Sequence, residues 1–173
     1  YEIHCVLVGS EMCIRDRYMR PEEGYGLRPN ISIRGTAIER SGKVTIMEDG
    51  ILVAPSPYTS SAAYYFPTMG RIHAVEVLKG PAAVSQGPQT IGGAINLLST
   101  PIPKITSFTL NQEMGENGML RTHAYYGGIS GNFGGLIEIH DHASDGFDSI
   151  ANVGGDTGFD KSDVVINATY ATD

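Results

Sequence analysis

The residues of this chain that could perform chemistry are few, and the most suggestive group lies near residue 140. His140 and His142 flank Asp141, and Asp145 and Asp148 follow, so imidazoles and carboxylates that could bind a metal ion are close in sequence. In an extended strand, however, alternate side chains point to opposite faces, and Asp141 would point away from both histidines. We therefore expect polar residues near a strand end and no metal site.

Other patterns that could indicate catalysis are incomplete. Residues 87–93 are rich in glycine but lack the Gly-Lys-Ser/Thr of a phosphate-binding loop and do not match the dinucleotide fingerprint. Ser85 has no glycine-flanked nucleophile elbow around it. Cys5 and Cys13 are the only cysteines, too few for a disulfide framework or, without further ligands, a zinc site. The sequence therefore predicts neither an enzyme nor a resident cofactor.

The segment around which the chain is organised is residues 71–103. Residues 75–77 alternate apolar and polar side chains, as in a short strand, and the Gly-Pro pair at 80–81 ends that strand. A second Gly-Pro pair at 87–88 and the Gly-Gly pair at 92–93 force two further bends before an apolar, extended run. The pattern predicts strand, bend, loop, bend and strand.

A shorter strand is predicted upstream, where Ile31 and Ile33 alternate with Ser32 and Arg34 and Gly35 follows. Because the period is two, we expect Arg34 to point away from the isoleucines.

A hairpin is predicted next, because Asp49-Gly50 separates the extended patterns of residues 44–48 and 51–53. Pro55 and Pro57 cannot continue the second strand, so we expect the chain to leave the sheet as a loop at residues 55–61. Loops fixed in this way often bind ligands.

Beyond Pro103 the sequence changes character. Four successive segments carry an apolar face and a polar face with a period of two, separated by turns rich in Gly, Asn and Asp. The four segments are residues 105–114, 119–126, 133–142 and 163–170. This alternation is typical of a membrane barrel, with apolar side chains toward lipid, but a half-buried soluble sheet gives the same pattern.

The bulk composition narrows the classes of partner. The chain has 173 residues, a net charge of -7 and 12 basic residues without a cluster, which argues against nucleic acid as a partner. The sequence contains no run of eighteen apolar residues, so it predicts no transmembrane helix. This absence does not exclude membrane-spanning strands. Residues 1–20 contain no signal peptide and no amphipathic pattern. We expect them to be a non-native leader without a tertiary role.

Several ordered motifs together resemble one family. RPNISIRG at 28–35, VTIMEDGILVAPSPY at 44–58, VEVLKGP at 75–81 and QGPQTIGGAINLLST at 86–100 look like the plug domain of TonB-dependent outer-membrane receptors. APSPY and GPQTIGG are most similar to the ferric-citrate type of receptor within that family. The resemblance implies an α+β plug domain, with a small mixed sheet and short helices, followed by antiparallel strands of a transmembrane β-barrel.

The resemblance also implies a domain division. Residues 21–103 would form a plug that lacks its beginning, and residues 104–173 the first strands of an incomplete barrel. Barrels of this plugged type have about 22 strands. We therefore expect the chain to be a fragment, and nothing in it matches the TonB box that couples such receptors to their energy source.

In the family, the apices of the plug face an extracellular iron chelate. By this resemblance the loop with Tyr58 and Thr59 and the loop with Gln86 and Gln89 would contact the ligand. A phenol and an amide can donate hydrogen bonds to carboxylate or hydroxamate oxygens of a chelate. Packing against the barrel wall is the alternative role for these side chains.

Three basic plug residues, Arg34, Arg71 and Lys79, would pair with carboxylates on the inner barrel wall, a role suited to a planar guanidinium. For Arg34 the alternative is a solvated strand residue. The implied function is uptake of a ferric chelate, such as a siderophore or ferric citrate, across the outer membrane. The implied partners are the TonB protein, the chelate and outer-membrane lipid, with no cofactor. The alternatives are a plug-type receptor for a vitamin or glycan, a signalling receptor, and a soluble β-rich binding protein.

Overall fold

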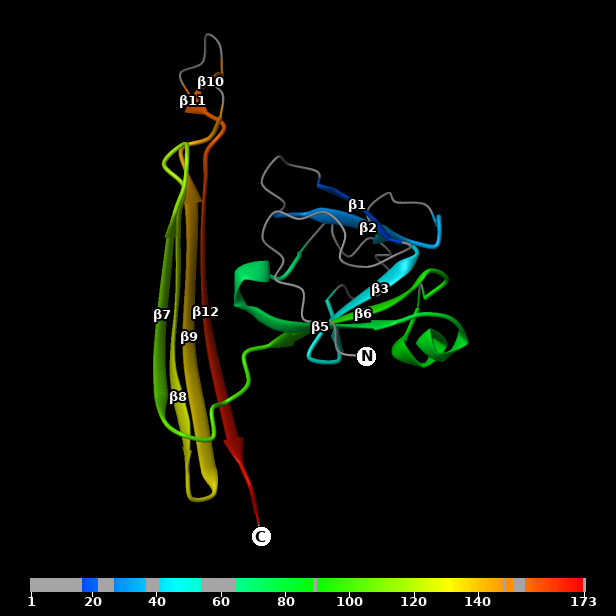
Figure 1. The fold of residues 1–173 in the computed structure, drawn as a ribbon. Coiled ribbons are helices and arrows are strands. Elements are labelled where there is room, and N and C mark those ends of the chain that lie inside the picture. Colours follow the sequence, from blue (N-terminus) through cyan, green and yellow to red (C-terminus); the bar gives the residue numbers. More distant parts are fainter. Residues whose placement is uncertain are drawn as a thin grey trace. The chain divides into compact units, whose positions relative to one another are not determined.

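The computed structural model describes residues 17–21, 27–36, 41–53, 65–88, 90–147, 149–150 and 155–172. The chain divides into two compact units, Tyr1–Thr100 and Pro101–Asp173 (Figure 1). Its described strands and 3-10 helices are, in order, β1 (Arg17–Pro21), β2 (Pro29–Ile33), β3 (Val44–Glu48), β4 (Ile51–Leu52), η2 (Met69–Arg71), β5 (Ile72–Leu78), η3 (Pro81–Gln86), β6 (Gly93–Ser99), β7 (Ser107–Met114), β8 (Leu120–Ser130), β9 (Phe133–Ser144), β10 (Ser149–Ile150), β11 (Gly155–Asp156) and β12 (Phe159–Tyr170).

The first unit is built on a four-stranded sheet of order β4-β3-β6-β5. Strands β3 and β6 run parallel, whereas β3 with β4 and β5 with β6 are antiparallel. The core consists of apolar side chains from β2, β3, β6 and the segment before η2: Ile31, Ile33, Val44, Ile46, Phe66, Ile95 and Leu97. The predicted small mixed sheet with short helices is thus confirmed.

Glycines make the bends that the sequence predicts between β5 and β6. Gly80 has a φ of 85° and Gly87 a φ of 120°, values that side chains with a Cβ rarely adopt. Gly93 opens β6 at a φ of 140°. The hairpin at Asp49-Gly50 is also present, with φ values of 50° and 80° as a type I′ turn requires. Its second strand, β4, is shorter than predicted by one residue.

The upstream strand differs from the prediction. Strand β2 ends at Ile33, and all five of its residues are buried, so Ser32 faces no solvent. Arg34 lies in a turn with a φ of 57°, closed by a hydrogen bond from Thr36 N to Ile33 O (3.2 Å). The expectation that Arg34 extends the strand opposite the isoleucines is therefore wrong, because the turn with Gly35 begins one residue earlier.

The leader predicted at residues 1–20 also needs a correction. Residues 17–20 belong to β1, which pairs antiparallel with β2 from Arg17 opposite Ile33 to Pro21 opposite Pro29. These four residues therefore have the tertiary role that the sequence did not indicate. Residues 1–16 lie outside the described residues.

The second unit is a four-stranded antiparallel sheet of order β12-β9-β8-β7 (Figure 1). Between β9 and β12 the short hairpin of β10 and β11 extends the connection. Exposed and covered side chains alternate along β9 and along most of β12. Phe133, Ile137 and Ile139 are exposed, and Glu138, His140 and His142 are buried, as the period of two predicts. In the part of the chain that the structure describes, no helix has the length and apolar character needed to cross a membrane.

Candidate functional site

The loop between η3 and β6 is held against β3 and β4 at one end of the sheet. Gly92 N donates a hydrogen bond to Lys43 O (2.7 Å), and Thr45 Oγ1 donates to Pro88 O. A Cβ at Gly87 would lie 3.4 Å from Leu52 Cδ2, so β4 packs directly beside this bend. The described ends of the loop, at Gly87, Pro88 and Gly92, are therefore held against β3 and β4.

Gln86 ends η3 at this loop and is half-buried. Its Nε2 donates to Ser85 Oγ at 3.4 Å, and Ser85 Oγ donates to Ala82 O at 2.8 Å. The carboxamide of Gln86 thus lies on a short helix that Pro81 initiates. This position suits a side chain that offers hydrogen bonds to a ligand.

The other three predicted ligand contacts, Tyr58, Thr59 and Gln89, lie outside the described residues. The described residues that precede Tyr58 and Thr59 show where the loop of these two residues begins. Strand β4 is antiparallel to β3, and Val53 N donates to Ile46 O (3.1 Å), so the chain enters residues 54–64 heading toward the start of β3. The start of β3 pairs with Gly93. Residues 54–64 therefore begin at the end of the sheet that carries the η3–β6 loop.

Two of the three predicted pairing cations, Arg34 and Lys79, follow residues that lie close to Gly93. A Cβ on Gly93 would lie 2.6 Å from Leu78 O and 3.4 Å from Ile33 Cδ1, so both residues lie close to Gly93. Arg34 and Lys79 directly follow them in sequence. Their pairing with barrel carboxylates stays a prediction.

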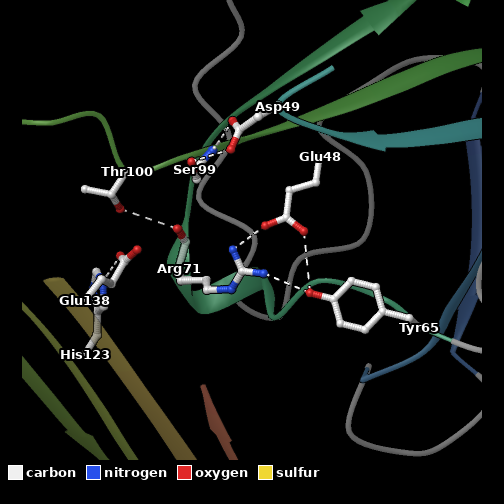
Figure 2. A network of polar contacts seen from close by, with 8 residues as sticks. All are labelled: Glu48, Asp49, Tyr65, Arg71, Ser99, Thr100, His123 and Glu138. Carbon is white, nitrogen blue, oxygen red and sulfur yellow. Dashed lines mark hydrogen bonds and ion pairs between the residues drawn. The ribbon is translucent and has the colours of Figure 1, made fainter. Parts of the chain in front are cut away.

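Arg71, the third predicted pairing cation, has partners within its own unit. Its side chain is 5% exposed; Nη1 forms an ion pair with Glu48 Oε1, and Nη2 donates to the Tyr65 hydroxyl at 3.0 Å (Figure 2). Burial alone would lower the pKa of this guanidinium, but its hydrogen bond to Glu48, the Glu48 charge and then Tyr65 raise it above the usual value. Arg71 is therefore a fixed cation at the end of β3, and its pairing with the barrel wall remains a prediction.

Further polar contacts connect the Asp49-Gly50 turn with the end of β6. Asp49 accepts hydrogen bonds from Ser99 N (3.0 Å) and Ser99 Oγ (2.5 Å), as Figure 2 shows. Gly50 N donates to Asn96 Oδ1 at 2.8 Å, and Asn96 Nδ2 donates to Glu76 Oε2 at 2.9 Å. The turn is thus bound to β6 by hydrogen bonds that involve side chains, as well as through the backbone.

On the second unit, the polar face carries a histidine pair that the sequence did not indicate. His123 lies opposite His140 in the β8–β9 register, and His123 Nε2 is 2.6 Å from Glu138 Oε1. Both ring nitrogens of His140 lack a hydrogen-bond partner within the described residues, and the side chain is 1% exposed. Within the same residues, no three His, Cys, Asp or Glu side chains are placed to hold a metal ion.

Sequence reasoning missed Glu48, Tyr65, His123 and Glu138. Glu48 and Tyr65 are joined to Arg71 across 23 and 6 residues, and nothing in the local pattern relates them. His123 and Glu138 lie on one face of adjacent strands, so the period-two pattern could have paired them once the register was known.

Residues 17–94 match the family described as TonB-dependent Receptor Plug Domain. The vitamin B12 transporter BtuB of Photobacterium profundum is 26% identical over 145 residues, which cover 82% of this chain and 23% of that protein. Among solved structures, the unliganded ferric citrate transporter FecA has a TM-score of 0.72 at 22% identity, covering 91% of this chain and 25% of FecA. The ferric yersiniabactin receptor FyuA of Yersinia pestis has a TM-score of 0.69 at 19% identity, with 90% and 24% covered. The chain thus spans about a quarter of the length of each of these proteins.

Proposed function

Because residues 17–94 are a TonB-dependent receptor plug domain, we propose that the protein takes up a ferric chelate across the outer membrane. TonB-dependent receptors are outer-membrane transporters and not enzymes. The plug would occlude a barrel whose first strands are β7, β8, β9 and β12, and energy delivered by TonB would rearrange the plug for passage. Partners of the complete receptor would be TonB, the chelate and outer-membrane lipid.

The observation that carries the proposal is the position of the described residues that flank two predicted ligand loops, because Val53, Gly87 and Gly92 are each held against β3 or β4. Residues 54–64 begin at the end of the sheet where the η3–β6 loop is pinned by Lys43 O, Thr45 and Leu52. Four hydrogen-bonding side chains belong to these two loops: Tyr58, Thr59, Gln86 and Gln89. Hydroxyl and amide groups suit the carboxylate or hydroxamate oxygens of a chelate. Solved relatives with this fold include transporters for ferric citrate and ferric yersiniabactin.

The experiment is a ligand titration of the full-length receptor and its variants. A hydrogen bond to a charged group contributes about 1.5–3 kcal/mol. Gln89→Ala should therefore weaken binding of ferric citrate, or of a hydroxamate chelate, by roughly ten- to a hundredfold. Tyr58→Phe should cost less, because the ring and its packing remain. Thr109→Ala, on β7, should bind normally. Unchanged affinity for every chelate in both plug variants would assign recognition to the barrel.

A vitamin is the second candidate ligand, because the curated relative with 26% identity is a vitamin B12 transporter. The same titration with cobalamin separates the two proposals. Saturable binding of cobalamin, with no binding of any ferric chelate, would identify the vitamin as the ligand. The class of receptor would stay the same.

A further inference from the structure

The segment that leads from the plug into β7 lies against two glycines of the second sheet. Residues 101–106 belong to the second unit and directly precede β7. A Cβ on Gly134 would lie 3.5 Å from Ile102 Cγ2, and a Cβ on Gly128 would lie 2.7 Å from Thr106 Cα. We call residues 101–106 the strap and the two glycines its seat.

The backbone conformation requires glycine at neither position of the seat. Gly128 lies within β8 and Gly134 is the second residue of β9, and neither has a positive φ. Glycine weakens a strand, because it has no side chain to pack and loses more conformational freedom on folding than other residues do. Within a strand it often marks a place where another part of the chain approaches closely. Here the approaching part is the strap.

The glycine next to Gly134 has different surroundings. Gly135 faces the opposite side of the sheet, where a Cβ would meet only the Phe133 ring, at an ordinary distance of 3.6 Å. Gly134 is buried on the polar face, where its Cβ would lie 2.8 Å from Thr169 Cγ2 and 3.3 Å from Ile129 Cγ1. Side chains of both neighbouring strands, together with the strap, thus enclose the position of the absent Cβ.

Two prolines limit the conformational freedom of the strap. Pro101 and Pro103 have a fixed φ, and each restricts the residue before it to extended conformations. Ile102 lies between them and is half-buried, whereas Ile105 is 83% exposed. Because the prolines restrict the chain in any state, little further freedom is lost when Ile102 packs on its seat.

The seat determines how much free chain connects the plug with β7. With the strap seated, the chain is held at Ile102, two residues after the first unit ends at Thr100. If the strap left its seat, the first held residue would be Ser107, which pairs with Gly127 of β8. Six extended residues span up to about 20 Å. Loss of the seat would therefore let the plug travel up to that much further.

We propose that the strap and its seat limit the travel of the plug during transport. This inference rests on the proposed function, in which energy delivered by TonB rearranges the plug. The strap stays on the barrel wall while the plug moves. The plug can then open a path for its ligand without leaving the lumen open to other large solutes.

The first test is Gly134→Leu in the full-length receptor, because a leucine side chain competes with Ile102 for the seat. Cells with this variant should become severalfold more sensitive to vancomycin, which is too large to cross an intact outer membrane, and only when TonB is present. Gly135→Leu adds the same side chain to the opposite face and should leave the sensitivity unchanged. If Gly134→Leu does not fold, Ile102→Ala removes the seated side chain without enlarging the strand, and should have the same TonB-dependent effect.

The second test fixes the strap to its seat by a disulfide between Ile102→Cys and Gly134→Cys. An Sγ in the place of Ile102 Cγ2 would be within reach, because that atom is 3.5 Å from the Cβ position of residue 134. The oxidised double variant should take up ferric citrate at the rate of the receptor without substitutions, and its vancomycin sensitivity should stay low. Reduction should raise the vancomycin sensitivity, because cysteine at position 102 no longer fills the seat.

Uptake that is blocked in the oxidised double variant and restored by reduction would show that the strap leaves its seat during transport, and would overturn the proposal. Unchanged vancomycin sensitivity in both Gly134→Leu and Ile102→Ala would also overturn it, as would an increase that does not depend on TonB. Failure of the proposed function is distinguishable. A receptor without substitutions that takes up neither ferric citrate nor a hydroxamate chelate would lose that function, whereas the vancomycin assay needs no chelate and still tests the strap.

Discussion

Replacing Gly93 by alanine should destabilise the plug more than any other single glycine change at the sheet. At a φ of 140°, an L side chain is strained, and this costs about 1–3 kcal/mol. The new Cβ would also lie 2.6 Å from Leu78 O, a backbone atom that cannot rotate away. Overpacking of this kind costs roughly 1–3 kcal/mol. The lower entropy of the unfolded alanine chain returns about 0.4–1 kcal/mol. The expected net loss is therefore about 1–5.6 kcal/mol, with a central value of about 3 kcal/mol.

Substitutions at two other glycines measure the cost of backbone strain and the cost of steric contact separately. Gly50 has a φ of 80° with nothing within 4 Å of its added Cβ, so Gly50→Ala should show strain alone, about 1–2 kcal/mol. Gly92 has no such φ, but its Cβ would meet Lys43 O, Thr36 Oγ1 and Val44 Cγ2, each at 3.1 Å. Gly92→Ala should show contact alone, and Gly93→Ala should exceed both.

Calorimetry of the full-length receptor measures these changes as shifts of the plug transition. For a domain of this size, 1 kcal/mol shifts Tm by about 4–8 °C, so Gly93→Ala should lower it by roughly 10 °C or more. A shift for Gly93→Ala no larger than that for Gly50→Ala would refute the close approach of Leu78 O. A Gly93→Ala variant that is more stable than the receptor with Gly93 would refute the bend at this residue.

The remaining predictions concern the turn and the barrel strands. Asp49→Ala removes the acceptor of both Ser99 hydrogen bonds and should lower plug stability by about 1.5–3 kcal/mol in the same calorimetry; Asp49→Asn, which keeps one acceptor, should lose less. Ile166→Arg places a charge on the apolar face of β12, where Ile166 is 73% exposed, and should cost about 2–4 kcal/mol in a bilayer. Asn167→Arg, on the polar face, is its control. The heat-resistant folded band in electrophoresis of outer membranes should be depleted only for Ile166→Arg, and equal bands would contradict the assignment of the faces.

Local chemistry allowed much of the fold to be predicted. Gly80, Gly87 and Gly93 occupy left-handed conformations that few other residues adopt, so their bends are visible in the sequence. Asp49-Gly50 similarly indicates its hairpin. Because strand side chains alternate with a period of two, the exposed Ile139 and the buried His140 could be assigned to opposite faces.

Interactions between distant segments could not be predicted. The Arg71–Glu48 pair depends on where η2 falls relative to the end of β3, and this follows from the parallel pairing of β3 with β6. The alternating pattern of residues 31–34 favours a strand position for Arg34. In the structure it adopts a left-handed turn that the sequence around Gly35 permits but does not require. Strand β1 was missed because its pairing with β2 leaves no periodic signal in residues 17–20.

The central claim is that this plug belongs to a receptor that imports a ferric chelate. Its most direct test is uptake of radioactive iron, supplied as ferric citrate, by cells in which the full-length protein is the sole receptor for that chelate. We expect saturable uptake that is lost when TonB is deleted and is reduced by Gln89→Ala. Cells that accumulate cobalamin but no iron from ferric citrate or from a hydroxamate chelate, under the same conditions, would contradict it.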